Sequence, residues 1–172
     1  MEIVIILGLI FFNGILSMSE IAMVSARKSR LETAAKKGSK TAKTALRLAN
    51  EPDRFLSTIQ IGITLIGILT GLYSGEALAG DLARWLETIG IPQAHSLTLA
   101  KGIIVILVTY LTLILGELVP KHLGMNAPEK IARLIARPME VLSKIASPFV
   151  WLLSASTQAV IRLTGLHTST EN

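Results

Sequence analysis

The sequence predicts an all-α membrane protein with three transmembrane helices per chain and amphipathic juxtamembrane helices at the cytoplasmic face. Of its residues 51% are hydrophobic and only 17% are charged, which is typical of a polytopic membrane domain. Three apolar runs each reach the roughly 20 residues that a helix needs to cross a bilayer. The charges lie in blocks between these runs, and the lack of cysteine excludes disulfides and thiolate metal sites.

The first transmembrane helix is predicted at residues 1–26. We expect it to be retained rather than cleaved as a signal peptide, because acidic Glu2 stands where a basic segment belongs. Asn13, Ser17 and Glu20 are spaced i, i+4 and i+7, so they share one helix face. This shared face favours a binding site. The alternative is that Asn13 and Ser17 bond neighbouring helices while Glu20 is solvated near the interface.

Residues 27–54 carry nine basic side chains against three acidic ones. Alanine and leucine recur among the charges, which predicts one or two amphipathic helices broken near Gly38. A solvated loop is the alternative, and the two interpretations are compatible. Because basic segments stay in the cytoplasm, this segment is expected inside and the N-terminus outside.

The second transmembrane helix is predicted at residues 55–79, with a stripe of polar or small side chains along one side. Gly67 and Gly71 form a spacing that is typical of close helix packing in membranes. Packing explains Gln60 and Thr64 less well, since both carry oxygens that a cavity could use. Residues 80–96 are predicted as an extracellular connection, with a short surface helix at 77–88.

The third transmembrane helix is predicted at residues 97–120, and a carboxylate lies near its end at Glu117. Such a charge is costly at membrane depth unless something binds it or water reaches it. Pro120 cannot donate a backbone hydrogen bond, so we expect a helix break that exposes carbonyl oxygens near Gly116. The alternative for Glu117 is an ion pair with Lys121 at i+4, which the proline disfavours.

Residues 121–166 are predicted as a helical belt at the cytoplasmic interface. Their last part, 145–166, is long enough for a fourth crossing, but Pro148 and Arg162 interrupt it, and the interfacial interpretation is preferred. The tail, 167–172, is expected to be disordered.

The motifs of common enzymes are absent, so no enzymatic activity is expected. The sequence has no phosphate-binding loop and no dinucleotide fingerprint, and its three histidines lack metal-ligand spacing. The net charge of +5 lies beside apolar runs, which favours membrane orientation over nucleic-acid binding. What remains is a set of oxygen ligands suited to Mg²⁺, Ca²⁺ or Na⁺: Asn13, Ser17, Glu20, Gln60, Thr64, Gly116 and Glu117.

Three motifs together resemble the membrane domain of the CorC / cyclin-M (CNNM) transporter family. They are Asn13-Gly14-x-x-Ser17-x-Ser19-Glu20, then Gln60-Ile61-Gly62-Ile63-Thr64, and Gly116-Glu117-Leu118-Val119-Pro120-Lys121. The resemblance covers nearly the whole chain. It implies a homodimer of three-helix protomers. The basic residues after the third span place that side in the cytoplasm, so in the cell membrane the N-terminus is expected outside and the C-terminus inside.

The resemblance also implies Mg²⁺ transport, as export coupled to Na⁺ entry. By their positions in the family motifs, the residues expected foremost at the ion site are Asn13, Ser17, Gly116 and Glu117. Glu20, Gln60 and Thr64 come next. Family members continue into a cytoplasmic CBS-type domain, so the chain is expected to be the membrane part of a longer protein. The competing hypothesis is a non-transporting membrane anchor for cytoplasmic regulatory domains. Two carboxylates in the polar set weigh against it.

Overall fold

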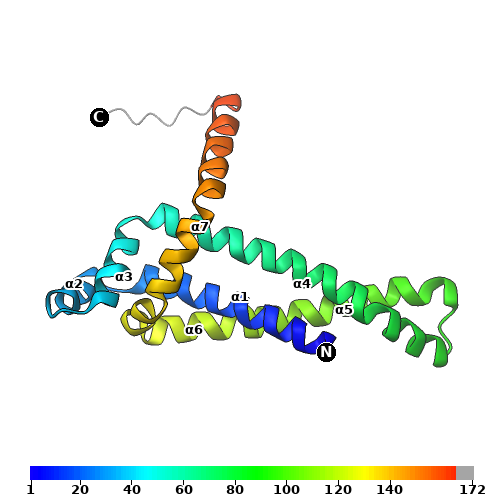
Figure 1. Ribbon diagram of the computed structural model, residues 1–172. Coiled ribbons are helices and arrows are strands. Elements are labelled where there is room, and N and C mark those ends of the chain that lie inside the picture. Colours follow the sequence, from blue (N-terminus) through cyan, green and yellow to red (C-terminus); the bar gives the residue numbers. More distant parts are fainter. Residues whose placement is uncertain (166–172) are drawn as a thin grey trace.

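Three long apolar helices form the body of the molecule. In the computed structural model, which describes residues 1–165, the segments long and apolar enough to cross a membrane are α1 (Glu2–Ser25), α4 (Pro52–Thr88) and the stretch Gln93–Asn126. Figure 1 shows them running side by side as a bundle. The described residues contain helices and no strands, which confirms the predicted fold class. The predicted disordered tail lies outside the described residues.

Two short helices follow α1 at the basic end of the bundle. α2 (Lys28–Lys36) and α3 (Lys40–Asn50) are separated at Gly38, whose φ of 99° suits glycine. Ser39 caps α3, because its side-chain oxygen accepts a hydrogen bond from the Ala42 amide at 3.2 Å. The basic segment therefore forms two helices with their break near Gly38.

The helix α4 is longer than the sequence predicts. It runs unbroken for 37 residues from Pro52 to Thr88, so the segment expected as a separate surface helix is its last part. The physical reason is the lack of a strong helix breaker before the turn, where Gly90 has a φ of 103° and Pro92 precedes α5. At about 1.5 Å per residue, α4 exceeds the roughly 30 Å of a bilayer core and extends beyond it.

The third long segment does not break at its proline. α5 (Gln93–Leu113) passes into a π-helical turn, η1 (Ile114–Leu118), and then into α6 (Val119–Asn126). The expected helix break is thus replaced by one wide turn, with Pro120 in the first turn of α6, where its missing amide hydrogen is tolerated.

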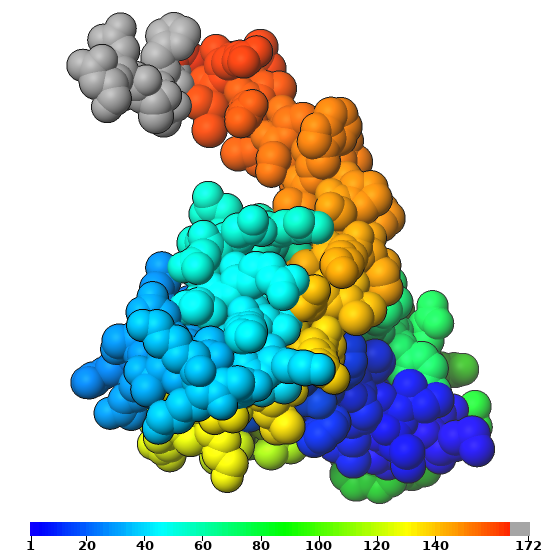
Figure 2. All heavy atoms as spheres, turned by 60° about the vertical axis from the view of Figure 1, so that its left-hand side comes forward, coloured from blue at the N-terminus to red at the C-terminus, as the bar shows by residue number. Residues whose placement is uncertain are grey.

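The last helix, α7 (Pro128–Leu163), crosses the bundle rather than joining it (Figure 1). Its first half packs against α1, α3 and α4, and there the main core lies. This core is built around Leu16, Leu31, Phe55, Ile59, Ile135 and Met139. The second half of α7 stands clear of the body in Figure 2, and its residues 151–160 are exposed. α7 is not among the helices apolar enough to span a membrane, so a fourth crossing is not supported.

The sides of the bundle are apolar and uncovered. Large hydrophobic side chains on α1, α4 and α5 are widely exposed, such as Phe11 and Ile106 at 70% each. An exposed apolar surface of this extent marks a contact with lipid or protein. Together with the three apolar helices, it places the bundle in a lipid bilayer.

Candidate cation site

The polar face of α1 is buried. Asn13 is 3% exposed and Ser17 is 1% exposed, and the i, i+4 spacing places them on the same side of the helix. This side faces η1 and α6, which pack closely against α1. The structure thus brings two predicted site residues of the first helix against the end of the third.

The π-helical turn presents a backbone carbonyl to this face. The Val119 amide donates to the Ile114 carbonyl, five residues back, and Pro120 has no amide hydrogen for the Gly116 carbonyl. Asn13 Nδ2 instead donates to the Gly116 carbonyl oxygen at 3.2 Å. Single π turns occur often at functional sites. Asn13 and Gly116, which are 103 residues apart in the sequence, are therefore direct partners.

Glycines allow the two backbones to approach this closely. A Cβ added to Gly14 would lie 3.0 Å from Pro120 Cγ and 3.1 Å from the Leu115 carbonyl oxygen. A Cβ added to Gly116 would lie 3.0 Å from Asn13 Nδ2. A side chain at position 14 would press on the backbone of η1, and one at position 116 would displace the Asn13 side chain from the Gly116 carbonyl. Gly14 was not predicted as a site residue, although its place between Asn13 and Ser17 was a signal.

The Ser17 hydroxyl is buried and makes no hydrogen bond within the described residues. A buried polar group without a partner costs roughly 1–3 kcal/mol, so such groups call for a ligand, ion or water. The hydroxyl lies one helical turn from Asn13, on the face that meets η1.

Glu117 points to a different side of η1. Its side chain is half-buried and lines a groove of about 260 Å³ between α4 and α5. The other lining residues include small and hydroxyl-bearing ones: Gly67, Thr70, Gly71, Ser74, Thr109 and Thr112. Within the described chain, no ion pair joins Glu117 to Lys121, and no hydrogen bond joins it to Asn13 or Ser17. A carboxylate and several hydroxyls thus share one groove next to the α1 contact.

Gly67 and Gly71 do not pack helices together within the chain. Both are exposed, and a Cβ at either position would meet nothing within 4 Å. They keep the groove beside Glu117 open, and the predicted role of these glycines in close helix packing is not seen within one chain. Thr70 was not predicted as a site residue, although it follows Gly67 by three residues and so belongs to the same stripe.

The remaining predicted residues do not join the contact between α1 and η1. Gln60 and Thr64 are exposed on α4, and Gln60 Nε2 donates to Thr64 Oγ1 at 3.4 Å. Their expected convergence on Gly116 is not found within one chain, because the helix turns them outward. Glu20 is half-buried on α1, one turn beyond Ser17.

A metal ion at this place would rely on mixed oxygen ligands. Residues 1–165 contain no group of three or more histidine, cysteine, aspartate or glutamate side chains that could hold a metal. Carbonyl, amide and hydroxyl oxygens with one carboxylate are nevertheless the ligand types of hard cations. The residues present fit Mg²⁺, Ca²⁺ or Na⁺ in chemical type.

Three apolar spans and a π turn that meets a buried polar face define a polytopic α-helical membrane domain. The chain belongs to the family of the cyclin M transmembrane N-terminal domain (CNNM), whose model matches residues 4–172. The resemblance found in the three sequence motifs is thereby confirmed.

Several curated proteins are similar along nearly the whole chain. A UPF0053 protein of Synechocystis sp. is 48% identical over 96% of this chain. The UPF0053 protein YhdT of Bacillus subtilis is 31% identical over 99%. The polyamine export protein of Escherichia coli K12 is 30% identical over 94%. The chain spans only 36–37% of the length of these three relatives. The family and its relatives indicate a transporter-related membrane domain.

Proposed function

We propose that this domain transports Mg²⁺ across the cell membrane, in the direction of export and coupled to Na⁺ entry. The observation that carries the proposal is the buried contact of Asn13 with the Gly116 carbonyl, beside the unpartnered Ser17 hydroxyl. These oxygens, with the adjacent Glu117 carboxylate, supply a hard-cation ligand set in a segment that spans the membrane. The proposed activity is transport rather than catalysis.

The arrangement also suggests how the site would work. Glu117 lines a groove open to its surroundings, whereas Asn13 and Ser17 are closed in against η1. A cation entering the groove would meet the carboxylate first, and a small opening between α1 and η1 would then offer it the carbonyl and hydroxyl oxygens. Gln60 and Thr64 lie outward on α4, so they contribute only across an interface with a second protomer. We therefore include the homodimer in the proposal.

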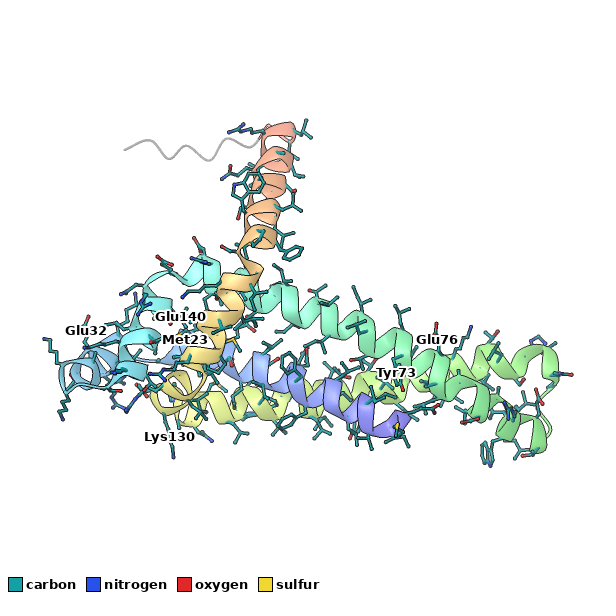
Figure 3. All side chains as sticks on the ribbon, in the orientation of Figure 1. Met23, Glu32, Tyr73, Glu76, Lys130 and Glu140 are labelled. Carbon is teal, nitrogen blue, oxygen red and sulfur yellow. The ribbon has the colours of Figure 1, made fainter. Side chains whose placement is uncertain are left out.

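The test is Mg²⁺ flux into or out of liposomes that contain the purified domain. Glu117→Ala is expected to abolish the flux, because the groove loses its carboxylate. Glu76→Gln is the matched control, since Glu76 is an exposed carboxylate on the same bundle and points away from it (Figure 3). Mg²⁺-dependent thermal stabilisation, measured against Ca²⁺, Mn²⁺ and Na⁺, reports binding separately. Unchanged flux and Mg²⁺ affinity in Glu117→Ala would sink the proposal.

A second candidate is the export of organic polycations. The groove beside Glu117, at about 260 Å³, is larger than an ion requires, and the Escherichia coli relative is a polyamine exporter by name. Adding spermidine to the flux assay separates the two. Competition with Mg²⁺ and transport of labelled spermidine would favour the polycation. A folded domain that moves neither would favour the membrane anchor.

A further inference from the structure

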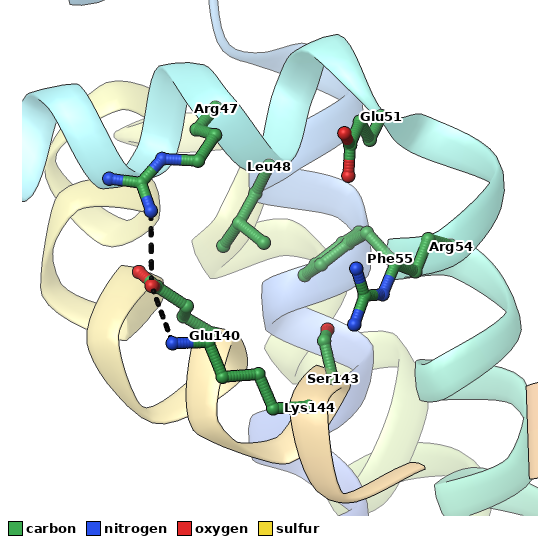
Figure 4. Close-up of a pocket in the computed structure, with 8 residues that line it drawn as sticks. All are labelled: Arg47, Leu48, Glu51, Arg54, Phe55, Glu140, Ser143 and Lys144. Atoms are coloured by element: carbon green, nitrogen blue, oxygen red, sulfur yellow. Dashed lines mark hydrogen bonds and ion pairs between the residues drawn. The ribbon is translucent and has the colours of Figure 1, made fainter. Parts of the chain in front are cut away.

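A second pocket, lined by charged side chains as well as by Leu48 and Phe55, lies at the basic end of the bundle, away from the contact between α1 and η1. It measures about 220 Å³ and opens where α3, the first turn of α4 and α7 meet (Figure 4). Its lining carries three cations, two carboxylates and one hydroxyl: Arg47, Arg54, Lys144, Glu51, Glu140 and Ser143.

Part of this charge is already paired. Glu140 accepts from Arg47 at 3.1 Å and lies 3.5 Å from Lys144 Nζ, so one carboxylate serves two cations. Within residues 1–165, neither Arg54 nor Glu51 has an ion-pair partner within 4.0 Å. Arg54 Nη2 donates to Ser147 Oγ at 3.0 Å, which leaves most of its five donors available. The pocket therefore presents one unpaired cation and one unpaired carboxylate.

Ser143 adds an unpartnered donor. The residue is 4% exposed, and its Oγ has no hydrogen-bond partner in the described part of the chain. Figure 4 shows the hydroxyl turned into the pocket, on the side of the Arg54 guanidinium. A ligand oxygen accepting from both groups would remove the cost of the buried hydroxyl.

We propose that this pocket binds the headgroup of a phospholipid that carries a primary amine. The phosphate lies against Arg54 and Ser143, because a guanidinium and a hydroxyl both donate to phosphoryl oxygens. The ammonium lies against Glu51, the carboxylate that has no cation of its own. A headgroup with phosphate alone fits less well, since it would leave the Glu51 carboxylate without a cation.

The surroundings of the pocket favour a lipid over a soluble phosphate. Arg54 also lines an adjacent hollow of about 360 Å³, which continues along α7 past Val150 and Trp151. Trp151 is 72% exposed, and tryptophan is enriched at the boundary between membrane and water. The hollow is also lined by Asp53, Ser57, Ser147 and Ser154, so its apolar contacts for an acyl chain are Val150 and Trp151.

The proposal is tested by native mass spectrometry of the purified chain with added lipids. Phosphatidylethanolamine is expected to stay bound several-fold more than phosphatidylcholine or phosphatidylglycerol. Phosphatidylcholine has no ammonium hydrogens for Glu51, and phosphatidylglycerol has no amine. Soluble phosphoethanolamine is the probe without acyl chains. Equal retention of the three lipids overturns the proposal, and phosphoethanolamine that competes at the lipid's own concentration overturns the assignment to a lipid.

Variants assign the contacts. Arg54→Gln and Ser143→Ala are expected to lower phosphatidylethanolamine binding several-fold, whereas Glu51→Gln removes the preference over phosphatidylglycerol. Arg137→Gln and Ser156→Ala are the matched controls, because both residues are exposed on α7 and line neither hollow. Unaltered lipid binding in all three pocket variants would contradict the assignment.

A stability measurement separates binding from folding. Without lipid, Ser143→Ala is expected to unfold at the wild-type temperature or above it, because the variant loses an unsatisfied buried hydroxyl. The rise in unfolding temperature on adding phosphatidylethanolamine is expected to shrink in this variant. A full lipid-dependent rise in Ser143→Ala would show that the hydroxyl holds no ligand.

Discussion

Gly124 lies where α6 crosses α1 with no room for a side chain. A Cβ at this position would be 2.8 Å from the Met18 carbonyl oxygen and 3.2 Å from Ile21 Cγ2. The first neighbour is backbone, so it cannot turn aside as a flexible side chain would. With Gly14 and Gly116, this residue sets the distance between the first and third membrane segments.

Gly124→Ala is expected to destabilise the domain by roughly 1–3 kcal/mol, because α1 and α6 must separate to admit the methyl group. Gly102→Ala is the control with the opposite sign. Gly102 lies inside α5 with nothing within 4 Å of an added Cβ, so alanine there gains roughly 0.5–1 kcal/mol of helix stability. Unfolding in detergent measures both. Equal effects of the two substitutions would refute the close contact.

Glu129 ties the start of α7 to the link between α1 and α2. Burial raises the pKa of its carboxyl, but hydrogen bonds from its own amide and the Arg27 amide, with the charges of Arg30 and Arg27, lower it overall. The Arg27 amide donates to Glu129 Oε1 at 3.2 Å, and Arg30 Nη1 lies 3.8 Å away. The ionised carboxylate is thus stabilised more in the folded than in the unfolded chain.

A lowered folded-state pKa makes this contribution depend on pH. It is fully present above the ordinary glutamate pKa, about 4.3, and is lost as pH falls through the lowered value. The thermal midpoint of Glu129→Gln is therefore expected to fall less than that of the wild type on acidification from pH 7 to pH 3. Glu32→Gln, at an exposed glutamate of α2 (Figure 3), is expected to keep the wild-type profile. Identical profiles for Glu129→Gln and the wild type would rule the contact out.

At the scale of elements, some features of the turn η1 could be predicted from the sequence and others could not. Helical spacing was sufficient to place Asn13 and Ser17 on one face. The missing amide hydrogen of Pro120 was sufficient to predict that the Gly116 carbonyl lacks its helical partner, although the helix does not break. The direction of Glu117 was not predictable, because a π turn and an α turn with the same residues point a side chain to different sides. Within one chain Gln60 and Thr64 do not reach Gly116 for a related reason, since spacing fixes a shared face but not its orientation.

Pro120→Ala tests the turn directly. The alanine amide can donate to the Gly116 carbonyl, so the π turn is expected to relax towards an α-helix and displace Asn13 from its partner. We expect the unfolding temperature to be kept or raised, with Mg²⁺ flux strongly reduced. Flux at the wild-type level would mean that the turn does not shape the proposed site. Pro92→Ala, in the loop before α5, is the control for a lost proline.

For the whole molecule, the fold class was predictable because membrane spans carry a strong apolar signal. The ends of the helices were harder to predict. The expected surface helix is the last part of α4, because hydropathy falls at the membrane boundary while the helix continues to the first breaker. The position of α7 across the bundle depends on its buried contacts with α1, α3 and α4, which no local pattern encodes.

The orientation in the membrane gives a test at this scale. The chain has no cysteine, so single cysteines can be introduced without a background. Lys37→Cys at the basic end is expected to react with a membrane-impermeant thiol reagent only from the cytoplasm, and Gln93→Cys in the opposite turn only from outside. Both residues are exposed, so failure to label is informative. Labelling of Lys37→Cys from outside and of Gln93→Cys from the cytoplasm would contradict the predicted orientation.

The π turn also changes which side of the third membrane segment faces each neighbouring helix. It contains one residue more than a regular turn, and one residue corresponds to about 100° of rotation around the helix axis. Everything after it, including Gly124, is rotated by that amount relative to α5. Two halves of one segment thereby serve two neighbours, α5 facing α4 while α6 faces α1. Deleting a single residue from η1 would rotate α6 by about 100° about its axis. Gly124 would then leave its contact with α1, and a larger side chain would take a place where only glycine fits.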